Sequence, residues 1–241
     1  MSDDRVLGIG VIGVGRMGRR RIALACEHDA TELVAISDVS VHAQELATAS
    51  RCAWASTAEE LIARSDVDVV VVSAPNALHL PLVKCALDEG KHVFCEKPLA
   101  RNVEEAREIV LAASVASTSA KVGANLRFFP NVLRAKELVD EGVLGTPMFA
   151  RGWIGHEGWN LNGSWFADAA LAGGGTFLDN GVHVFDVIRW LLGEVEAGTG
   201  LIRQAMHPIA PLEDNGFGLF EFVNGAVAYV QASWTEWAGY M

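Results

Sequence analysis

The sequence predicts an α/β protein in which a doubly wound parallel sheet is followed by an α+β domain with a mostly antiparallel sheet. Strand-like and helix-like segments alternate through the first half of the chain. The run from Val67 to Val72 is almost entirely β-branched and apolar, as expected of a strand buried on both faces. After about residue 124 the pattern changes. We therefore expect two domains, residues 1–123 and 124–241.

The alternation in the first half places each expected element. Thr57 with Glu60 is typical of a capping box at a helix start, and Asn102 with Glu105 of a looser one. The predicted strands are 6–12, 32–37, 68–73, 92–95 and 120–124, and the predicted helices are 16–28, 41–49, 57–64, 77–89 and 102–114.

The second half predicts a helix over 129–141, a strand over 148–154, a loop rich in Gly, Trp and Asn, and a helix over 178–192. Strand-like runs follow at 197–206, 216–223 and 226–235. Asn224-Gly225 between two of them predicts a two-residue hairpin turn that pairs Phe222 with Val227 and Phe220 with Tyr229. The last strand would be an open apolar edge, so we expect this domain to be incomplete or the edge to be covered by a partner.

Composition narrows the class of protein. The chain has 241 residues, 51% of them apolar, and a net charge of −11, which indicates a folded protein and argues against nucleic acid as a partner. No apolar run is long enough for a bilayer, and no signal peptide precedes the first strand, so we expect a cytoplasmic protein. The four cysteines have no metal spacing, and we expect reduced thiols and no metal site.

A glycine-rich turn follows the first predicted strand. Gly13, Gly15 and Gly18 form the pattern G-x-G-x-x-G, with a helix after them and Asp38 twenty residues beyond Gly18 at the end of the second strand. Gly13 allows a tight turn, Gly15 lets the backbone approach a pyrophosphate, and Gly18 lets the helix pack closely. The helix N-terminus favours phosphate. The first domain is thus predicted to be a Rossmann domain that binds a dinucleotide.

Asp38 favours NAD over NADP. Its carboxylate can accept hydrogen bonds from both ribose hydroxyls, whereas it would repel a 2′-phosphate, and residues 39–41 offer no cation for that phosphate. Arg16 and Met17 frame the turn and are counted with the cofactor-binding residues.

Three further clusters carry residue types suited to chemistry. Ser73-Ala74-Pro75-Asn76, with His79, follows one parallel strand, and Glu96-Lys97-Pro98 follows the next. Both lie at carboxyl ends of strands, where open α/β sheets bind ligands. Asp179 and His183, four residues apart after Gly173-Gly174-Gly175, share one face of a helix.

These motifs, taken in order, resemble the glucose–fructose oxidoreductase / inositol dehydrogenase / MocA family over essentially the whole chain. The resemblance implies a Rossmann domain, a second domain built on a large sheet, a nicotinamide cofactor and a sugar or polyol substrate. Members of this family typically run about a hundred residues longer.

The resemblance also implies roles for particular residues. Lys97 matches the lysine of the family's Glu-Lys-Pro, and Asp179 and His183 match its substrate-side acid and histidine. Asn76 and His79 match a segment near the nicotinamide ribose, and Arg127 matches an active-site arginine loosely. The predicted cofactor-binding residues are Gly13, Gly15, Arg16, Met17, Gly18, Asp38, Ser73, Pro75, Asn76, His79, Glu96 and Lys97.

The residue types suit oxidation of a secondary alcohol. A histidine titrates near neutrality, so His183 is the candidate base, and the ammonium of Lys97 would favour a developing alkoxide. Asp179 would bind substrate or orient the imidazole. Lys97 as the proton relay is an alternative. Pro98 permits a cis bond after Lys97, which would aim that side chain inward. His156 and Trp159 lie in a loop predicted to contact substrate.

Three functions are compatible with these motifs and with the resemblance. The first is an NAD(P)-dependent dehydrogenase acting on a CH–OH group of a sugar, inositol or similar polyol, in a homodimer or homotetramer joined by the sheet's outer face. The second is a redox-neutral glycosidase that keeps its NAD bound, and the third is a non-catalytic nucleotide-binding regulatory protein.

Overall fold

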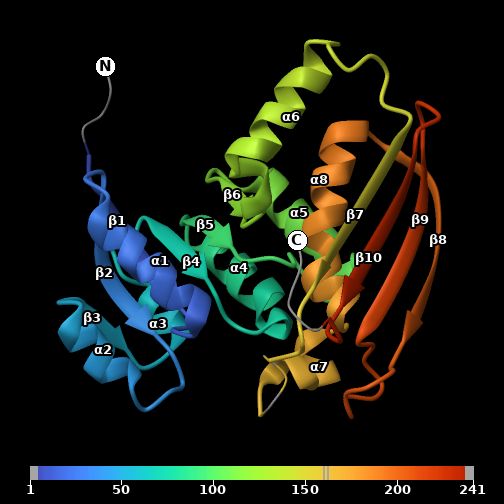
Figure 1. Cartoon of the computed structure of the whole chain (residues 1–241). Coiled ribbons are helices and arrows are strands. Elements are labelled where there is room, and N and C mark those ends of the chain that lie inside the picture. The colour runs from blue at the N-terminus through green and yellow to red at the C-terminus, as the bar shows by residue number, and fades with distance from the viewer. Residues whose placement is uncertain (1–4, 160, 162, 237–241) are drawn as a thin grey trace. The chain divides into compact units, whose positions relative to one another are not determined.

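The computed structural model describes residues 5–159, 161 and 163–236. The chain divides into two compact units, Met1–Gly123 and Ala124–Met241, each with its own sheet (Figure 1). Among the residues described, no helix has the length and apolar character needed to cross a bilayer.

The first unit is built on a six-stranded parallel sheet in the order β3-β2-β1-β4-β5-β6. Strand order reverses between β1 and β4, which creates the switch point of a doubly wound fold. This confirms the predicted fold of the first half. The strands are β1 (Leu7–Ile12), β2 (Thr31–Ser37), β3 (Ala53–Ala55), β4 (Val69–Val72), β5 (His92–Cys95) and β6 (Ala120–Val122). β3 was not predicted, because a strand of three residues carries too little pattern to stand out.

Helices between the strands bury two separate apolar clusters. The helices are α1 (Arg16–Glu27), α2 (Ala43–Ala49), α3 (Ala58–Ile62), η1 (Asn76–Leu78), α4 (His79–Asp88) and α5 (Val103–Val115). One cluster packs residues of α3, α4 and α5 against the sheet, and the other packs residues of α1 and α2. Both predicted caps are present, since the side chains of Thr57 and Asn102 accept from the N–H of Glu60 and Glu105 at 3.1 and 2.9 Å.

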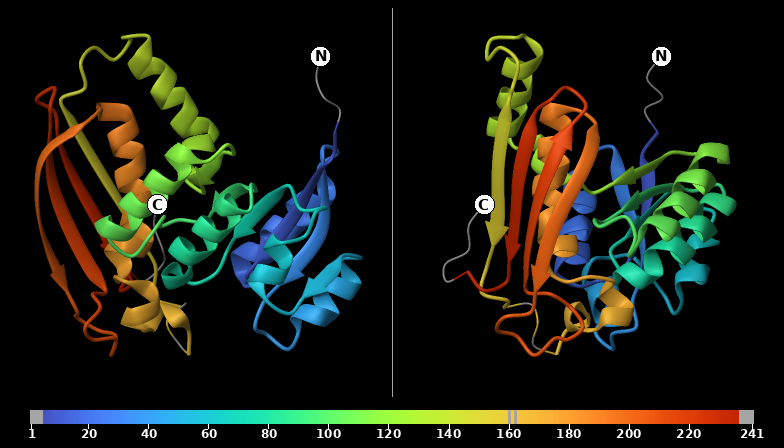
Figure 2. Two further views of the ribbon diagram at one scale, coloured as in Figure 1. Left: turned by 180° about the vertical axis from the view of Figure 1, so that it is seen from behind. Right: turned by 90° about the vertical axis from the view of Figure 1, so that its right-hand side faces the viewer.

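The second unit contains a four-stranded sheet in the order β7-β10-β9-β8, with α8 along one face (Figure 2). Two of its three strand pairs are antiparallel and the β7–β10 pair is parallel. The elements are η2 (Asn125–Phe128), α6 (Pro130–Asp140), β7 (Phe149–Gly155), η3 (Trp165–Ala167), α7 (Ala169–Ala172), η4 (Phe177–Gly181), α8 (Val182–Leu192), β8 (Val195–Arg203), β9 (Asn215–Phe222) and β10 (Val227–Ser233).

The predicted hairpin exists, but its register was wrong by one residue. Phe220 lies opposite Ala228, not Tyr229. The amide of Phe222 donates to the carbonyl of Ala226 at 2.9 Å, so the loop has three residues and not two. The third loop residue, Gly225, has φ +83°. A three-residue loop that ends in a left-handed glycine is the next most common hairpin connection.

The expectation that the last strand is an open edge was also wrong. β10 lies between β7 and β9, so its backbone is paired on both sides. The edges of the sheet are β7 and β8. One face of the sheet packs on α8, where Ile188 and Leu192 meet Ala228 and Val230. Residues of the other face remain exposed, among them Trp153, Leu219 and Val227.

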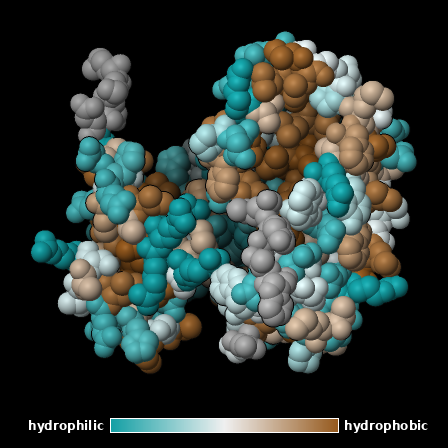
Figure 3. Space-filling view, viewed as in Figure 1, coloured by the Kyte–Doolittle hydropathy of each residue, from teal (hydrophilic) through white to brown (hydrophobic). Residues whose placement is uncertain are grey.

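Apolar side chains also gather at the surface of the second unit around α6 and the start of β7 (Figure 3). The exposed residues there are Leu133, Val143, Leu144, Met148 and Phe149.

Candidate functional site

The loops that carry the first group of predicted residues meet at the carboxyl edge of the parallel sheet. The amide of Gly13 donates to Ser37 at 2.9 Å, that of Ser73 to Ile12 at 2.8 Å, and that of Glu96 to Val72 at 2.9 Å. These bonds extend the strand ladder one residue beyond the strands. The glycine turn, Asp38, the Ser73 loop and Glu96 are thus placed beside one another by backbone bonding.

The glycine turn is shaped by close backbone contacts. Gly13 has φ +89°, and a Cβ there would lie 2.5 Å from the carbonyl oxygen of Ser73. A Cβ on Gly18 would lie 1.8 Å from the carbonyl oxygen of Gly13. Only a glycine at position 18 therefore lets the helix pack this close to the turn. Gly15 differs, because nothing lies within 4 Å of its Cβ position. The backbone is therefore closely packed at Gly13, whereas the space beside Gly15 is open.

Asp38 is fixed to this turn. One carboxylate oxygen accepts the N–H of Val14 at 2.6 Å and the other accepts that of Ser40 at 2.7 Å. Each oxygen keeps a second lone pair that a ribose hydroxyl can use. Val39 and Val41, which flank Ser40, are exposed.

His79 joins two of the edge loops. It is buried, its Nε2 lies 3.0 Å from the carbonyl oxygen of Ala74, and its Nδ1 lies 2.9 Å from that of Pro98. The pKa of His79 is lowered, because the effect of burial outweighs the hydrogen bonds to these carbonyls, which by themselves would raise it. Of the predicted neighbours, Asn76 is also buried. The Ser73 hydroxyl is buried and has no hydrogen-bond partner among the described residues.

Glu96 is paired with the helix that follows the glycine turn. Its carboxylate accepts from Nε of Arg21 at 2.6 Å, and the guanidinium of Arg21 lies over the ring of Phe94, 4.6 Å from its centre. This use of Glu96 was not predicted. The Lys97–Pro98 bond is cis, as hypothesised from the sequence.

The residues at this edge fit a dinucleotide. The space above Gly15 can accept a phosphate, the N-terminus of α1 favours its charge, and the Ser73 hydroxyl offers a further polar contact.

In the second unit, Asp179 and His183 lie on one continuous helical segment. Asp179 is buried within η4, a π-helical turn, and His183 lies in the first turn of α8. A π turn in an otherwise α-helical segment is often found at functional sites. Both residues lie one turn apart on a segment packed against β10.

A glutamate distant in sequence caps this helical segment. The carboxylate of Glu213 accepts the N–H of Gly175 at 2.9 Å and that of Phe177 at 3.0 Å, and its backbone carbonyl accepts that of Thr176 at 3.1 Å. A Cβ on Gly175 would lie 1.9 Å from the same carbonyl oxygen, so the last glycine of the triplet is required by this contact.

The remaining predicted substrate residues have partners within their own unit. Arg127 makes a bidentate ion pair with Asp186, in which its Nη2 and Nε donate to the two carboxylate oxygens at 2.6 and 2.7 Å. The guanidinium carbon of Arg127 lies 5.4 Å from the ring centre of Trp190. The hydrogen bond to Asp186 raises the pKa of Arg127. His156 and Trp159 pack their rings 5.5 Å apart.

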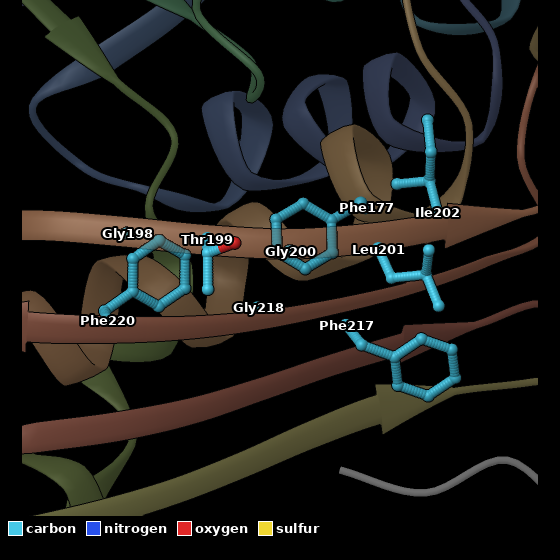
Figure 4. A pocket seen from close by; sticks show the side chains of 9 residues that line it. All are labelled: Phe177, Gly198, Thr199, Gly200, Leu201, Ile202, Phe217, Gly218 and Phe220. Carbon is cyan, nitrogen blue, oxygen red and sulfur yellow. The ribbon is translucent and has the colours of Figure 1, made fainter.

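The second unit also has an apolar hollow against β8 and β9 (Figure 4). It is lined by Phe177, Gly198, Thr199, Gly200, Leu201, Ile202, Phe217, Gly218 and Phe220, and contains none of the predicted site residues.

Within the part of the chain that the structure describes, no group of three or more His, Cys, Asp or Glu side chains is placed to hold a metal ion.

A parallel sheet with a glycine turn at its switch point defines a dinucleotide-binding protein of the Rossmann class. The chain belongs to the GFO/IDH/MocA oxidoreductase family: residues 7–124 match its NAD-binding Rossmann domain and residues 132–241 match its C-terminal domain.

Three similar proteins illustrate the range of this family. The chain is 32% identical to 1,5-anhydro-D-fructose reductase of Ensifer adhaerens over 94% of its own length and 69% of that protein. It is 32% identical to inositol 2-dehydrogenase 3 of Saccharopolyspora erythraea, covering 90% and 64%. The crystal structure of GenD2 from gentamicin A biosynthesis in complex with NAD superposes with a TM-score of 0.90 at 30% identity, covering 96% and 67%. The chain spans from about half to about two thirds of the curated relatives it matches.

Sequence patterns missed two residues that shape the site. Arg21 is one of three consecutive arginines and Glu213 one of two consecutive acids. Neither pattern shows which of the adjacent residues turns toward the site, because their partners lie 75 and 36–38 residues away.

Proposed function

We propose that the protein is an NAD-dependent dehydrogenase that acts on a CH–OH group of a sugar, inositol or similar polyol. The observation that carries the proposal is the carboxyl edge of the parallel sheet, where the open glycine turn, Asp38 and the loop of Lys97 are bonded side by side. Family relatives named as an inositol dehydrogenase and an anhydrofructose reductase support the substrate class.

In this proposal the first unit holds the cofactor. The N–H groups at the start of α1, with Gly13, Gly15, Arg16, Met17 and Gly18, hold the pyrophosphate. Asp38 binds the adenosine ribose, and the loops of Ser73, Pro75, Asn76, Glu96 and Lys97 border the nicotinamide half. Bound NAD supplies the hydride acceptor. NAD is favoured over NADP because Asp38 presents its charge beside two exposed valines.

In this proposal three side chains of the protein act on the substrate hydroxyl. His183 accepts the hydroxyl proton as the alcohol is oxidised, since an imidazole titrates near neutrality. The ammonium of Lys97 stabilises the charge that develops on the substrate oxygen. Asp179, buried one turn before His183, orients the substrate or the imidazole. His156 and Trp159 are candidates for substrate contact. Arg127 is the weakest of these candidates, because Asp186 already holds its guanidinium.

We further propose that the protein acts as a homodimer or homotetramer. The sheet of the second unit leaves Trp153, Leu219 and Val227 exposed on the face away from α8, and a second copy would cover them. The molar mass in solution, measured by light scattering, tests this part of the proposal.

The deciding experiment is a panel of inositols, sugars and glycosides incubated with NAD or NADP while absorbance of the reduced cofactor and loss of the substrate are followed. Net NADH from one polyol supports the proposal, and stronger binding of NADP than NAD overturns the cofactor preference. Consumption of a glycoside without net NADH identifies a redox-neutral enzyme instead. Binding of NAD with no turnover across the panel identifies a non-catalytic regulator.

A further inference from the structure

We infer that Glu213 is a positioning residue that sets the start of the helical segment carrying Asp179 and His183. The inference rests on the proposed roles of those two residues. Glu213 itself lies in the connection between β8 and β9, 34 residues after Asp179 and 30 residues after His183.

The argument begins with the orphan donors of a helix start. The first N–H groups of a helix have no partner within it and must be satisfied from outside. At this start three consecutive N–H groups, those of Gly175, Thr176 and Phe177, are accepted by one residue, Glu213. Its carboxylate also places negative charge at the positive end of the helix dipole.

Glu213 is buried and held in place by its neighbour. The carboxylate of Asp214 accepts the N–H groups of Ala205, Met206 and His207 at 2.7, 2.7 and 2.9 Å. Burial alone would raise the pKa of Asp214, but these hydrogen bonds together lower it. The backbone of Asp214 is bonded to Arg203 and Trp234. Hydrogen bonds thus hold the loop around Glu213 to the end of β8 and to the residue that follows β10.

The cap acts directly on the register of the proposed acid. The amide of Asp179 donates to the carbonyl of Gly175 at 3.0 Å, the residue whose own N–H is held by Glu213. Phe177, the other residue held by the carboxylate, opens the π turn that contains Asp179. Loss of the carboxylate would leave the N–H groups of Gly175 and Phe177 without this acceptor and let the π turn shift. The shift would displace Asp179 within the turn, and with it His183 in the next turn of the helix.

The test compares Glu213→Ala, Glu213→Gln and a matched cap variant, Thr57→Ala, which removes the side-chain cap of α3 in the other unit. Amide hydrogen exchange over residues 175–183 is measured with each variant. We expect exchange there to rise about 5- to 30-fold in Glu213→Ala, less in Glu213→Gln, which keeps one acceptor, and not at all in Thr57→Ala.

Turnover is measured with myo-inositol and NAD, and in reverse with 1,5-anhydro-D-fructose and NADH. We expect kcat to fall about 10- to 100-fold in Glu213→Ala, with partial rescue by Gln and unchanged affinity for NADH. Unchanged exchange over 175–183 overturns the inference. So does raised exchange with unchanged kcat. If the unaltered protein turns over neither substrate, the proposed function loses support, and the exchange measurement alone decides the role of Glu213.

Discussion

Arg21 and Glu96 form a largely buried ion pair, 2.6 Å long, that joins helix α1 to the loop carrying Lys97. Substitution of Arg21 by Ala leaves the carboxylate of Glu96 in a site where it has little access to water. We expect the free energy of unfolding to fall by about 3 kcal/mol. Urea unfolding followed by circular dichroism measures it. Arg134→Ala, which removes an exposed pair with Glu137, should cost less than about 1 kcal/mol. Equal losses would contradict the burial argument.

Substitution of Lys97 tests the proposed electrostatic role. In Lys97→Ala we expect kcat to fall by about 10²- to 10⁴-fold, because the developing charge on the substrate oxygen loses its cation. Steady-state kinetics with the best substrate of the panel measure this. Lys84→Ala, at a half-buried lysine of α4 paired with Glu108, should leave kcat unchanged. Undiminished turnover in Lys97→Ala would end its assignment as a catalytic residue.

Asp38→Asn removes the negative charge from the ribose site. The amide oxygen can accept the N–H of Val14, but the charge and the acceptor of the Ser40 N–H are both lost. We expect the Kd of NADH to rise about 10- to 100-fold, while binding of NADPH weakens less or improves. Fluorescence titration with both cofactors gives the ratio. A ratio unaffected by the substitution would show that Asp38 does not select the cofactor.

The buried imidazole of His79 predicts a pH-dependent stability. Burial lowers its pKa below the ordinary value of 6.5, so the unfolded chain binds a proton more readily than the folded one. Stability is therefore complete above about pH 6.5 and falls as the pH is lowered below that value. Urea midpoints between pH 5 and 8, measured on the protein and on His79→Gln, check this. The variant should be less stable at pH 8 and show a flatter slope over the acidic range.

Cys95 and Cys26 should differ sharply in reactivity. Cys95 is buried, and burial, with a smaller contribution from Glu96, raises its pKa to about 12, whereas Cys26 is exposed. Because the thiolate is the reactive form, alkylation of Cys95 by iodoacetamide should be at least about 100-fold slower than that of Cys26. Mass spectrometry of timed samples distinguishes the two sites. Comparable rates in the folded protein would show that β5 opens readily.

Local features were predictable because their causes are local. The glycine turn, the caps at Thr57 and Asn102 and the parallel strands all follow from neighbouring residues, and each occurs in the structure. The hairpin at Gly225 was predictable in existence but not in register. A two-residue and a three-residue loop suit the same Asn-Gly sequence, and only pairing across the sheet selects between them.

By itself, the sequence determined the doubly wound fold of the first unit and the order of three chemical motifs, because hydrophobic period and glycine placement act within a few residues. The tertiary structure alone decided which side chains support those motifs. Arg21 holds Glu96, His79 joins Ala74 to Pro98, and Glu213 caps the helix of Asp179. These supports are set by burial: once a charge or a donor is removed from water, it must be satisfied by whichever partner the fold brings near, at any separation along the chain.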